Sequence, residues 1–117
     1  MKIAVIVLAG TEHHEGLGRV VNALETAKEF IQAGDEVTVV FDGAGVQGLA
    51  AISAEDHKSH ALYQAVHGEV RGACSFCARA FGVRAKLEAA GIPLLSEFED
   101  HPSLRQLMLD GYQLLTF

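Results

Sequence analysis

Apolar and polar positions follow each other along this chain in a pattern that predicts strands alternating with helices. Five segments are rich in apolar and β-branched residues and have the length of strands: residues 2–9, 36–41, 69–74, 92–95 and 112–117. Four segments between them have helical spacing or helix-start signals: residues 17–33, 53–67, 76–90 and 103–110. A glycine follows each of these helices, where a C-terminal cap is expected: Gly34, Gly68, Gly91 and Gly111.

This strict alternation predicts right-handed crossovers and a single α/β domain over residues 1–117. We expect a three-layer α/β/α sandwich around a mostly parallel five-stranded sheet, with helices on both faces. In such sheets, ligands and chemistry lie beyond the carboxyl ends of the strands. The loops of interest are therefore residues 10–16, 42–48, 74–77 and 96–101.

Composition and charge exclude several classes of protein. The chain of 117 residues is half hydrophobic, which suits one packed core, and its formal net charge is −6. Nine Lys and Arg against fifteen Asp and Glu predict no binding to nucleic acid. The apolar residues 2–9 are too few for a membrane helix and no small-residue cleavage site follows them. Two cysteines in a CxxC spacing favour a reducing cytoplasm over a secreted disulfide scaffold.

Cys74 and Cys77 are the residues best placed for chemistry, because they lie where the third predicted strand passes into a helix. The N-terminus of a helix stabilises an anion, so we expect a lowered thiol pKa there. Arg79 adds positive charge nearby, although the sequence does not give its direction. The alternative is that both cysteines are small packed hydrophobes. A thioredoxin-like interpretation fits poorly, since CxxC is expected near the first strand of that fold.

Further polar residues on the same loops form a possible pocket: Thr11, His13, His14, Asp42, Gly43 and His57. His13 or His14 could hold an anion or move a proton, although solvated loop histidines are commoner. The sequence from residue 43 to residue 48 matches the GxGxxG dinucleotide fingerprint, but it follows the second strand and lacks a suitable acidic partner. We interpret it as a flexible turn and expect no cofactor.

A metal site is also not expected from the spacing of possible ligands. One CxxC supplies two ligands, and no second CxxC or HxxxH pair completes four. His57 and His60 are three residues apart and could ligate a metal, but such a pair is more often a solvated or partner-facing surface.

Several segments together resemble the DsrE-like (DsrE/DsrF-like) sulfur-relay family: the start KIAVIVLAG, the turn FDGAGV, and GACSFCARAFGV followed by AAGIPLL. The most specific feature is a cysteine at the end of the third strand with the valine of a Gly-Val step nine residues on, here Cys74 and Val83. The resemblance implies a parallel α/β/α sandwich, a trimeric or hexameric homo-oligomer, and transfer of sulfur as a cysteine persulfide between donor and acceptor proteins. Cys74 would be the sulfur acceptor. Cys77 departs from the single-cysteine pattern of the relay subunits.

Two functional hypotheses follow. The first is a sulfur carrier or sulfurtransferase acting through Cys74, with Cys77 as a resolving thiol. The second is a non-catalytic module of the same fold that binds a small ligand or serves in assembly. We also expect a homo-oligomer from an apolar helix face that contains His60, Leu62, Tyr63 and Val66.

Overall fold

The computed structural model describes residues 1–117 and contains one five-stranded sheet in which all neighbouring strands are parallel. The strands are β1 (Lys2–Val7), β2 (Glu36–Phe41), β3 (Val70–Cys74), β4 (Leu94–Leu95) and β5 (Gln113–Thr116). Their spatial order is β4-β3-β2-β1-β5. The first four strands are therefore added in sequence order in one direction, and β5 then joins the opposite edge beside β1. The predicted α/β class is confirmed.

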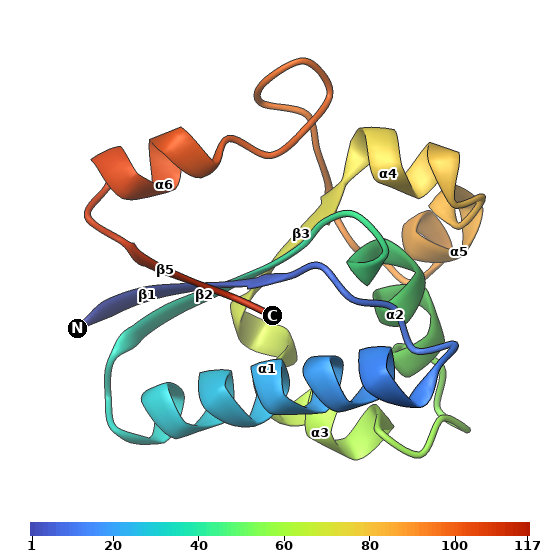
Figure 1. Cartoon of the computed structure of the whole chain (residues 1–117), viewed down its shortest axis with the longest axis horizontal. Helices are drawn as coiled ribbons and strands as arrows, with labels where there is room; N and C mark the ends of the chain where they lie inside the picture. The colour runs from blue at the N-terminus through green and yellow to red at the C-terminus, as the bar shows by residue number, and fades with distance from the viewer.

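Helices connect every pair of successive strands. They are α1 (His14–Gln32), α2 (Gly45–Ile52), α3 (His60–Val66), α4 (Ser75–Ala80), α5 (Arg84–Ala89) and α6 (Leu104–Leu109), with a 3-10 turn, η1 (His67–Glu69), before β3. Figure 1 shows α1 and α3 on one side of the sheet and α6 on the other. None of the helices combines the length and the apolar character needed to cross a bilayer.

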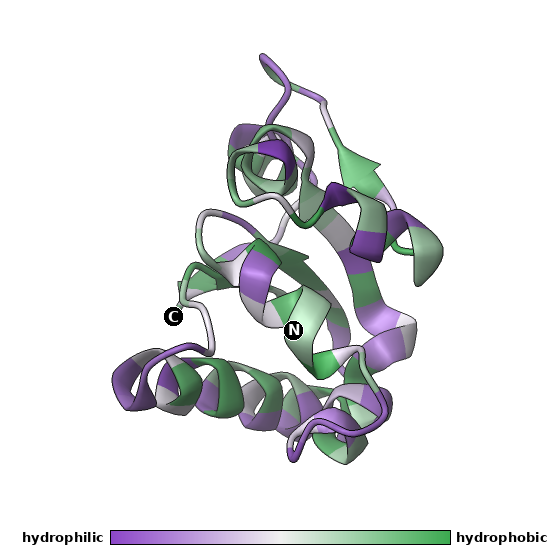
Figure 2. Cartoon of the chain, turned by 90° about the vertical axis from the view of Figure 1, so that its right-hand side faces the viewer, coloured by the Kyte–Doolittle hydropathy of each residue, from purple (hydrophilic) through white to green (hydrophobic).

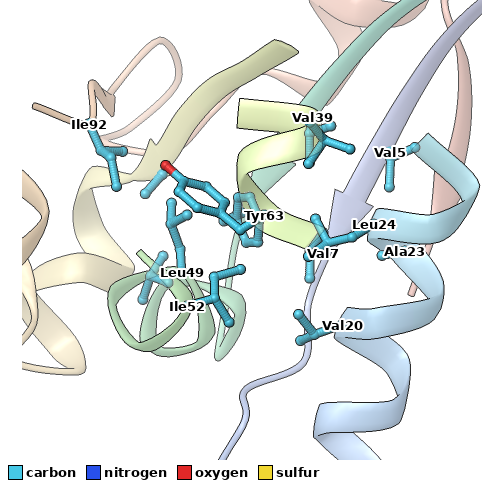
Figure 3. Packing of buried hydrophobic residues seen from close by; sticks show 14 of the residues in the cluster. Val5, Val7, Val20, Ala23, Leu24, Val39, Leu49, Ile52, Tyr63 and Ile92 are labelled. Carbon is cyan, nitrogen blue, oxygen red and sulfur yellow. The ribbon is translucent and has the colours of Figure 1, made fainter. Parts of the chain in front are cut away.

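The two faces of the sheet are packed very unequally. Alternate residues of β1 point to opposite faces, so Val5 and Val7 join the large core beneath α1, where Val20 and Leu24 contact them. Figure 3 shows this core with Tyr63 of α3 among its side chains. On the other face, a cluster of four buried residues consists of Ala4, Ile6, Val40 and Leu107. Leu107 of α6 is the helical side chain that seals it.

The glycine-rich segment after β2 is helical, so its interpretation as a flexible turn is wrong. Residues 45–52 form α2, whose first residue lies against the end of β1. A Cβ atom at Gly45 would lie 2.0 Å from the carbonyl oxygen of Val7. Glycine is needed here because the two backbones touch, and not because the chain must be flexible.

Two other helix boundaries also differ from the prediction. Ser53 follows the end of α2, where its hydroxyl donates to the Ala50 carbonyl at 3.0 Å, so it does not start the next helix, which begins at His60. The segment 76–90 is not one helix either. Gly82, with φ of 69°, ends the first of two helices there, and the Val83 N–H donates back to the Ala78 carbonyl at 2.9 Å.

The apolar face proposed for oligomerisation is mostly interior. Tyr63 and Val66 are buried in the core of the same chain, so they offer no surface to a partner. Large apolar side chains are exposed elsewhere: Leu8, Phe76, Phe81, Phe98, Met108 and Leu109, besides Met1. The argument from α3 is therefore wrong, whereas the oligomeric state itself stays a prediction.

Candidate functional site

Cys74 and Cys77 lie at the carboxyl end of β3, as the sequence predicts. Cys74 is the last residue of the strand, and Cys77 lies in α4, which starts at Ser75. The backbone N–H of Cys77 donates to the Cys74 sulfur at 3.4 Å, so the side chain of Cys74 acts as the N-cap of α4. Cys74 is fully buried and Cys77 is partly exposed, and both are free thiols.

The loop from Ser96 to His101 brings a histidine to Cys74. The Nδ1 atom of His101 lies 3.2 Å from the Cys74 sulfur. Reciprocal backbone hydrogen bonds between Phe98 and His101, of 2.9 and 2.8 Å, close the loop on itself. The Phe76 N–H donates to the Asp100 carbonyl at 2.9 Å, and the Phe76 ring lies against the imidazole with centroids 4.9 Å apart. The backbone hydrogen bonds of His101 and the contact of its ring with Phe76 thus hold the imidazole in place.

Asp42 completes the group from the end of β2. Its Oδ1 atom accepts the Gly43 N–H at 2.8 Å and the Cys77 thiol at 3.5 Å. The two sulfurs, one carboxylate oxygen and one ring nitrogen of His101 all lie within 4.8 Å of one another. These are the ligand types that zinc prefers, so the residues that could hold a metal come from three separate loops. The sequence indicated the two cysteines and placed Asp42 among the possible pocket residues, but it did not indicate His101.

The electrostatics of Cys74 differ from the expectation for a helix N-terminus. Burial raises the pKa of the Cys74 thiol to about 12, and the Cys77 N–H opposes this shift only in part. Nearby Asp42 raises the pKa further, because a negative charge disfavours the thiolate. A six-residue helix does not outweigh removal of the sulfur from water. The expected lowering of this pKa is therefore wrong.

Arg79 points to the loop and not to the sulfurs. It forms an ion pair with Asp100, and its hydrogen bond is the main cause that lowers the pKa of that carboxyl group, followed by a hydrogen bond from Ser75. Glu99 and Asp100 both have positive φ, of 47° and 69°, which non-glycine residues adopt at a cost in free energy. Figure 2 looks onto the carboxyl ends of the strands. It shows that the loop 96–101, at the top of the view, is mostly hydrophilic.

The other four residues of the expected pocket, Thr11, His13, His14 and His57, do not join the cysteines. Thr11 hydrogen bonds to Gln47 through both its N–H, at 2.8 Å, and its hydroxyl, at 3.2 Å. His13 lines a hollow of about 380 Å³ together with Arg19 and Phe81.

His14 and His57 do not line this hollow. His14 is the exposed first residue of α1. His57 accepts the Ser59 N–H at 3.0 Å in the connection between α2 and α3. Of the six predicted residues, Asp42 and its neighbour Gly43 join the cysteines. His101 was missed, although its loop was among those of interest.

The fold and this centre define a parallel α/β protein with a Cys-His-Cys-Asp cluster at the carboxyl edge of its sheet. No family model matches the chain, and no curated protein matches it. Among solved structures, it is similar to the ychN protein from E. coli, with a TM-score of 0.66 and 18% identity over 100% of this chain and 99% of that one. It is also similar to BT1422 from Bacteroides thetaiotaomicron, a conserved protein of unknown function, with a TM-score of 0.61 and 16% identity over 97% and 94% of the chains. At these identities the likeness shows the fold alone.

Proposed function

We propose that this protein accepts and carries sulfur as a persulfide on Cys74, as the resemblance to the DsrE-like family implies. The observation that carries the proposal is the 3.2 Å distance between the Cys74 sulfur and His101 Nδ1. A nucleophile within hydrogen-bonding distance of a general base is the arrangement that thiol catalysis requires. Sulfur-donor and sulfur-acceptor proteins would be the partners, in a reducing cytoplasm.

The chemistry needs no cofactor. His101 takes the proton of the Cys74 thiol, and the thiolate attacks the terminal sulfur of a donor hydropersulfide. The donor S–S bond breaks, its inner sulfur leaves as a thiolate, and that thiolate receives the proton from His101. The net exchange converts the Cys74 thiol and the donor persulfide into the Cys74 persulfide and the donor thiol.

Cys77 supplies a second step. Its sulfur can attack the inner sulfur of the Cys74 persulfide, which forms a Cys74–Cys77 disulfide and releases hydrogen sulfide. The donation of its own N–H to the Cys74 sulfur keeps the two residues close. Cys77 is then a resolving thiol, and its removal should prolong the life of the persulfide.

Access to Cys74 requires movement of the loop 96–101, because the sulfur is fully buried. The loop lies against the sulfur through His101 and through the carbonyl oxygen of Asp100, which is 3.9 Å away. Two residues of positive φ within it favour such a movement, since opening relieves their backbone strain. The donor would reach the sulfur in the opened state.

The test is the intact mass of metal-free protein after incubation with a low-molecular-weight hydropersulfide. The wild type should gain one sulfur atom, and Cys74→Ser should gain none. Cys77→Ser should load and retain the sulfur for longer. His101→Gln should load more slowly, by about 10²-fold if the histidine acts as a general base. Equal loading of Cys74→Ser would show that another residue is the acceptor.

The second candidate function is a non-catalytic module for ligand binding or assembly. The complete burial of Cys74 favours it, as does the hollow lined by His13, Arg19 and Phe81. Such a module predicts no sulfur gain by the wild type at any donor concentration that leaves the protein folded. A trimer or hexamer is expected under either function, and light scattering measures it.

A further inference from the structure

We propose that Cys74, Cys77, His101 and Asp42 form a binding site for one Zn²⁺ ion. The four side chains offer two sulfurs, one imidazole nitrogen and one carboxylate oxygen, all within 4.8 Å of one another. Zinc binds these atom types in tetrahedral sets of four, and paired thiolates select it over magnesium and calcium. The site goes beyond sulfur transfer and does not depend on it.

The distances fit a tetrahedron that is slightly expanded. Zinc bonds of about 2.0–2.3 Å place neighbouring ligand atoms about 3.3–3.8 Å apart. Two opposite edges of the cluster already lie close to this range, with 3.2 Å from Cys74 to His101 and 3.5 Å from Cys77 to Asp42. The ion must draw the widest pair, at most 4.8 Å apart, inwards by roughly 1 Å. Because three ligands lie on loops or a helix start, small side-chain rotations suffice.

The topology explains why these ligands meet. Asp42 follows β2, Cys74 ends β3 and His101 lies on the loop that follows β4. These are three neighbouring strands of the sheet, and parallel strands end at the same edge. The ligands therefore meet at one edge of the sheet, although Asp42 and His101 are 59 residues apart in the chain.

Hydrogen bonds from backbone N–H groups already orient two of the four ligands, Asp42 and Cys74. The Gly43 N–H holds the Asp42 carboxylate at 2.8 Å, and the Cys77 N–H points at the Cys74 sulfur at 3.4 Å. Outer hydrogen bonds of this kind fix ligand orientation and strengthen metal binding. Zinc would replace the protons of the two thiols, which are released to solvent, so the buried Cys74 sulfur becomes charged only together with the cation that compensates its charge.

A bound zinc ion would prevent sulfur loading. The Cys74 thiolate, which attacks the donor persulfide, would be bound to the metal, so loading should occur only after zinc leaves. The site would then hold the cysteines in a reduced, unreactive form between transfers.

The experiment titrates metal-free, reduced full-length protein with Zn²⁺ in competition with a chromophoric zinc chelator, and in parallel with Co²⁺. We expect one ion per chain. Cobalt should give the intense visible bands of a tetrahedral site together with thiolate-to-cobalt charge-transfer absorption. Octahedral cobalt spectra without charge-transfer bands, or no binding to the wild type, would overturn the proposal without any variant.

Variants assign the ligands. Cys77→Ser and His101→Gln should weaken zinc binding at least about 100-fold, and Asp42→Asn at least about 10-fold, if they are direct ligands. His67→Gln and Asp56→Asn are matched controls, since both residues are exposed and lie outside the cluster. Circular dichroism checks that each variant is folded. Equal weakening by the controls would contradict the assignment.

The two proposals can fail separately. Sulfur gain by metal-free protein that binds no zinc would leave the proposed function standing and remove the zinc site. Zinc binding by a protein that never gains sulfur would do the opposite.

Discussion

Arg79 of α4 forms an ion pair with Asp100, the residue whose carbonyl oxygen lies 3.9 Å from the Cys74 sulfur. The pair ties α4 to the loop 96–101, so its removal should favour opening. Exposed ion pairs contribute weakly to stability, so the open population should change by no more than about 5-fold. Arg79→Ala should therefore speed alkylation of Cys74 by up to about 5-fold. Site-resolved mass spectrometry measures the rate at each cysteine.

Arg19→Ala is the matched control for this prediction. Arg19 forms an exposed ion pair with Glu15 within α1, which lies on the other side of the sheet from α6. The rate at Cys74 should be unchanged in this variant.

In the wild type, Cys77 should be alkylated before Cys74, because Cys77 is partly exposed and Cys74 is buried. From its position at the end of β3 alone, Cys74 would be expected to react first, so burial reverses the expected order of reaction.

Leu107 should contribute much of the stability of the second face of the sheet. It is 2% exposed and packs with Ala4, Ile6 and Val40, with no other helix on that side. Leu107→Ala should lower the free energy of unfolding by about 2–5 kcal/mol. Met108→Ala, one residue further and 65% exposed, should change it by less than about 0.5 kcal/mol. Urea denaturation measures both, and similar losses would show that α6 packs differently.

Gly45 and Gly18 both lie in helices, yet alanine should have opposite effects at the two positions. At Gly45 the new Cβ would lie 2.0 Å from the Val7 carbonyl oxygen, so α2 must move away from β1. We expect a loss of about 1–3 kcal/mol or more. At Gly18 in α1 nothing lies within 4 Å, and alanine should stabilise the protein by about 0.5–1 kcal/mol. Thermal unfolding of the two variants tests the contrast.

Tyr63 should ionise at unusually high pH. Burial raises the pKa of its phenol above the ordinary value of 10.0. Between pH 10.0 and the raised pKa of Tyr63 in the folded chain, the unfolded chain releases the phenol proton and the folded chain retains it. The free energy of unfolding should therefore fall as pH rises through this window. Tyr112→Phe leaves Tyr63 as the one remaining tyrosine of two. Its phenolate absorbance should then appear above pH 10.0, and a midpoint at or below that value would contradict the prediction.

The strands could be predicted from the sequence because their signal is local. Residues 36–41 are strand in both the prediction and the structure, and the Cys74 position at a strand end is also correct. The segment 43–48 was misread because a run of glycines suits a flexible turn and a close helix equally well. Contact between Gly45 and Val7 decides between them, and that contact exists only in the folded chain.

The site was predictable only in part, for the same physical reason. Asp42 directly follows β2 and Cys74 is the last residue of β3, so their place at the carboxyl edge was visible. His101 approaches Cys74 because β4 lies beside β3 and the loop folds back, which depends on strand order. The loop also removes Cys74 from water, and this burial reverses the pKa shift that local helix position suggests.

The pairing of β1 with β5 has a consequence for synthesis on the ribosome. On the side of β1 away from β2, Ile3 pairs with Gln113, and the Phe117 N–H donates to the Ile6 carbonyl oxygen at 2.9 Å. Until β5 emerges, one side of the apolar β1 has no strand to pair with. Such an edge invites pairing with other chains, so the nascent protein should be prone to aggregation until β5 has emerged and should benefit from chaperones that bind extended apolar segments.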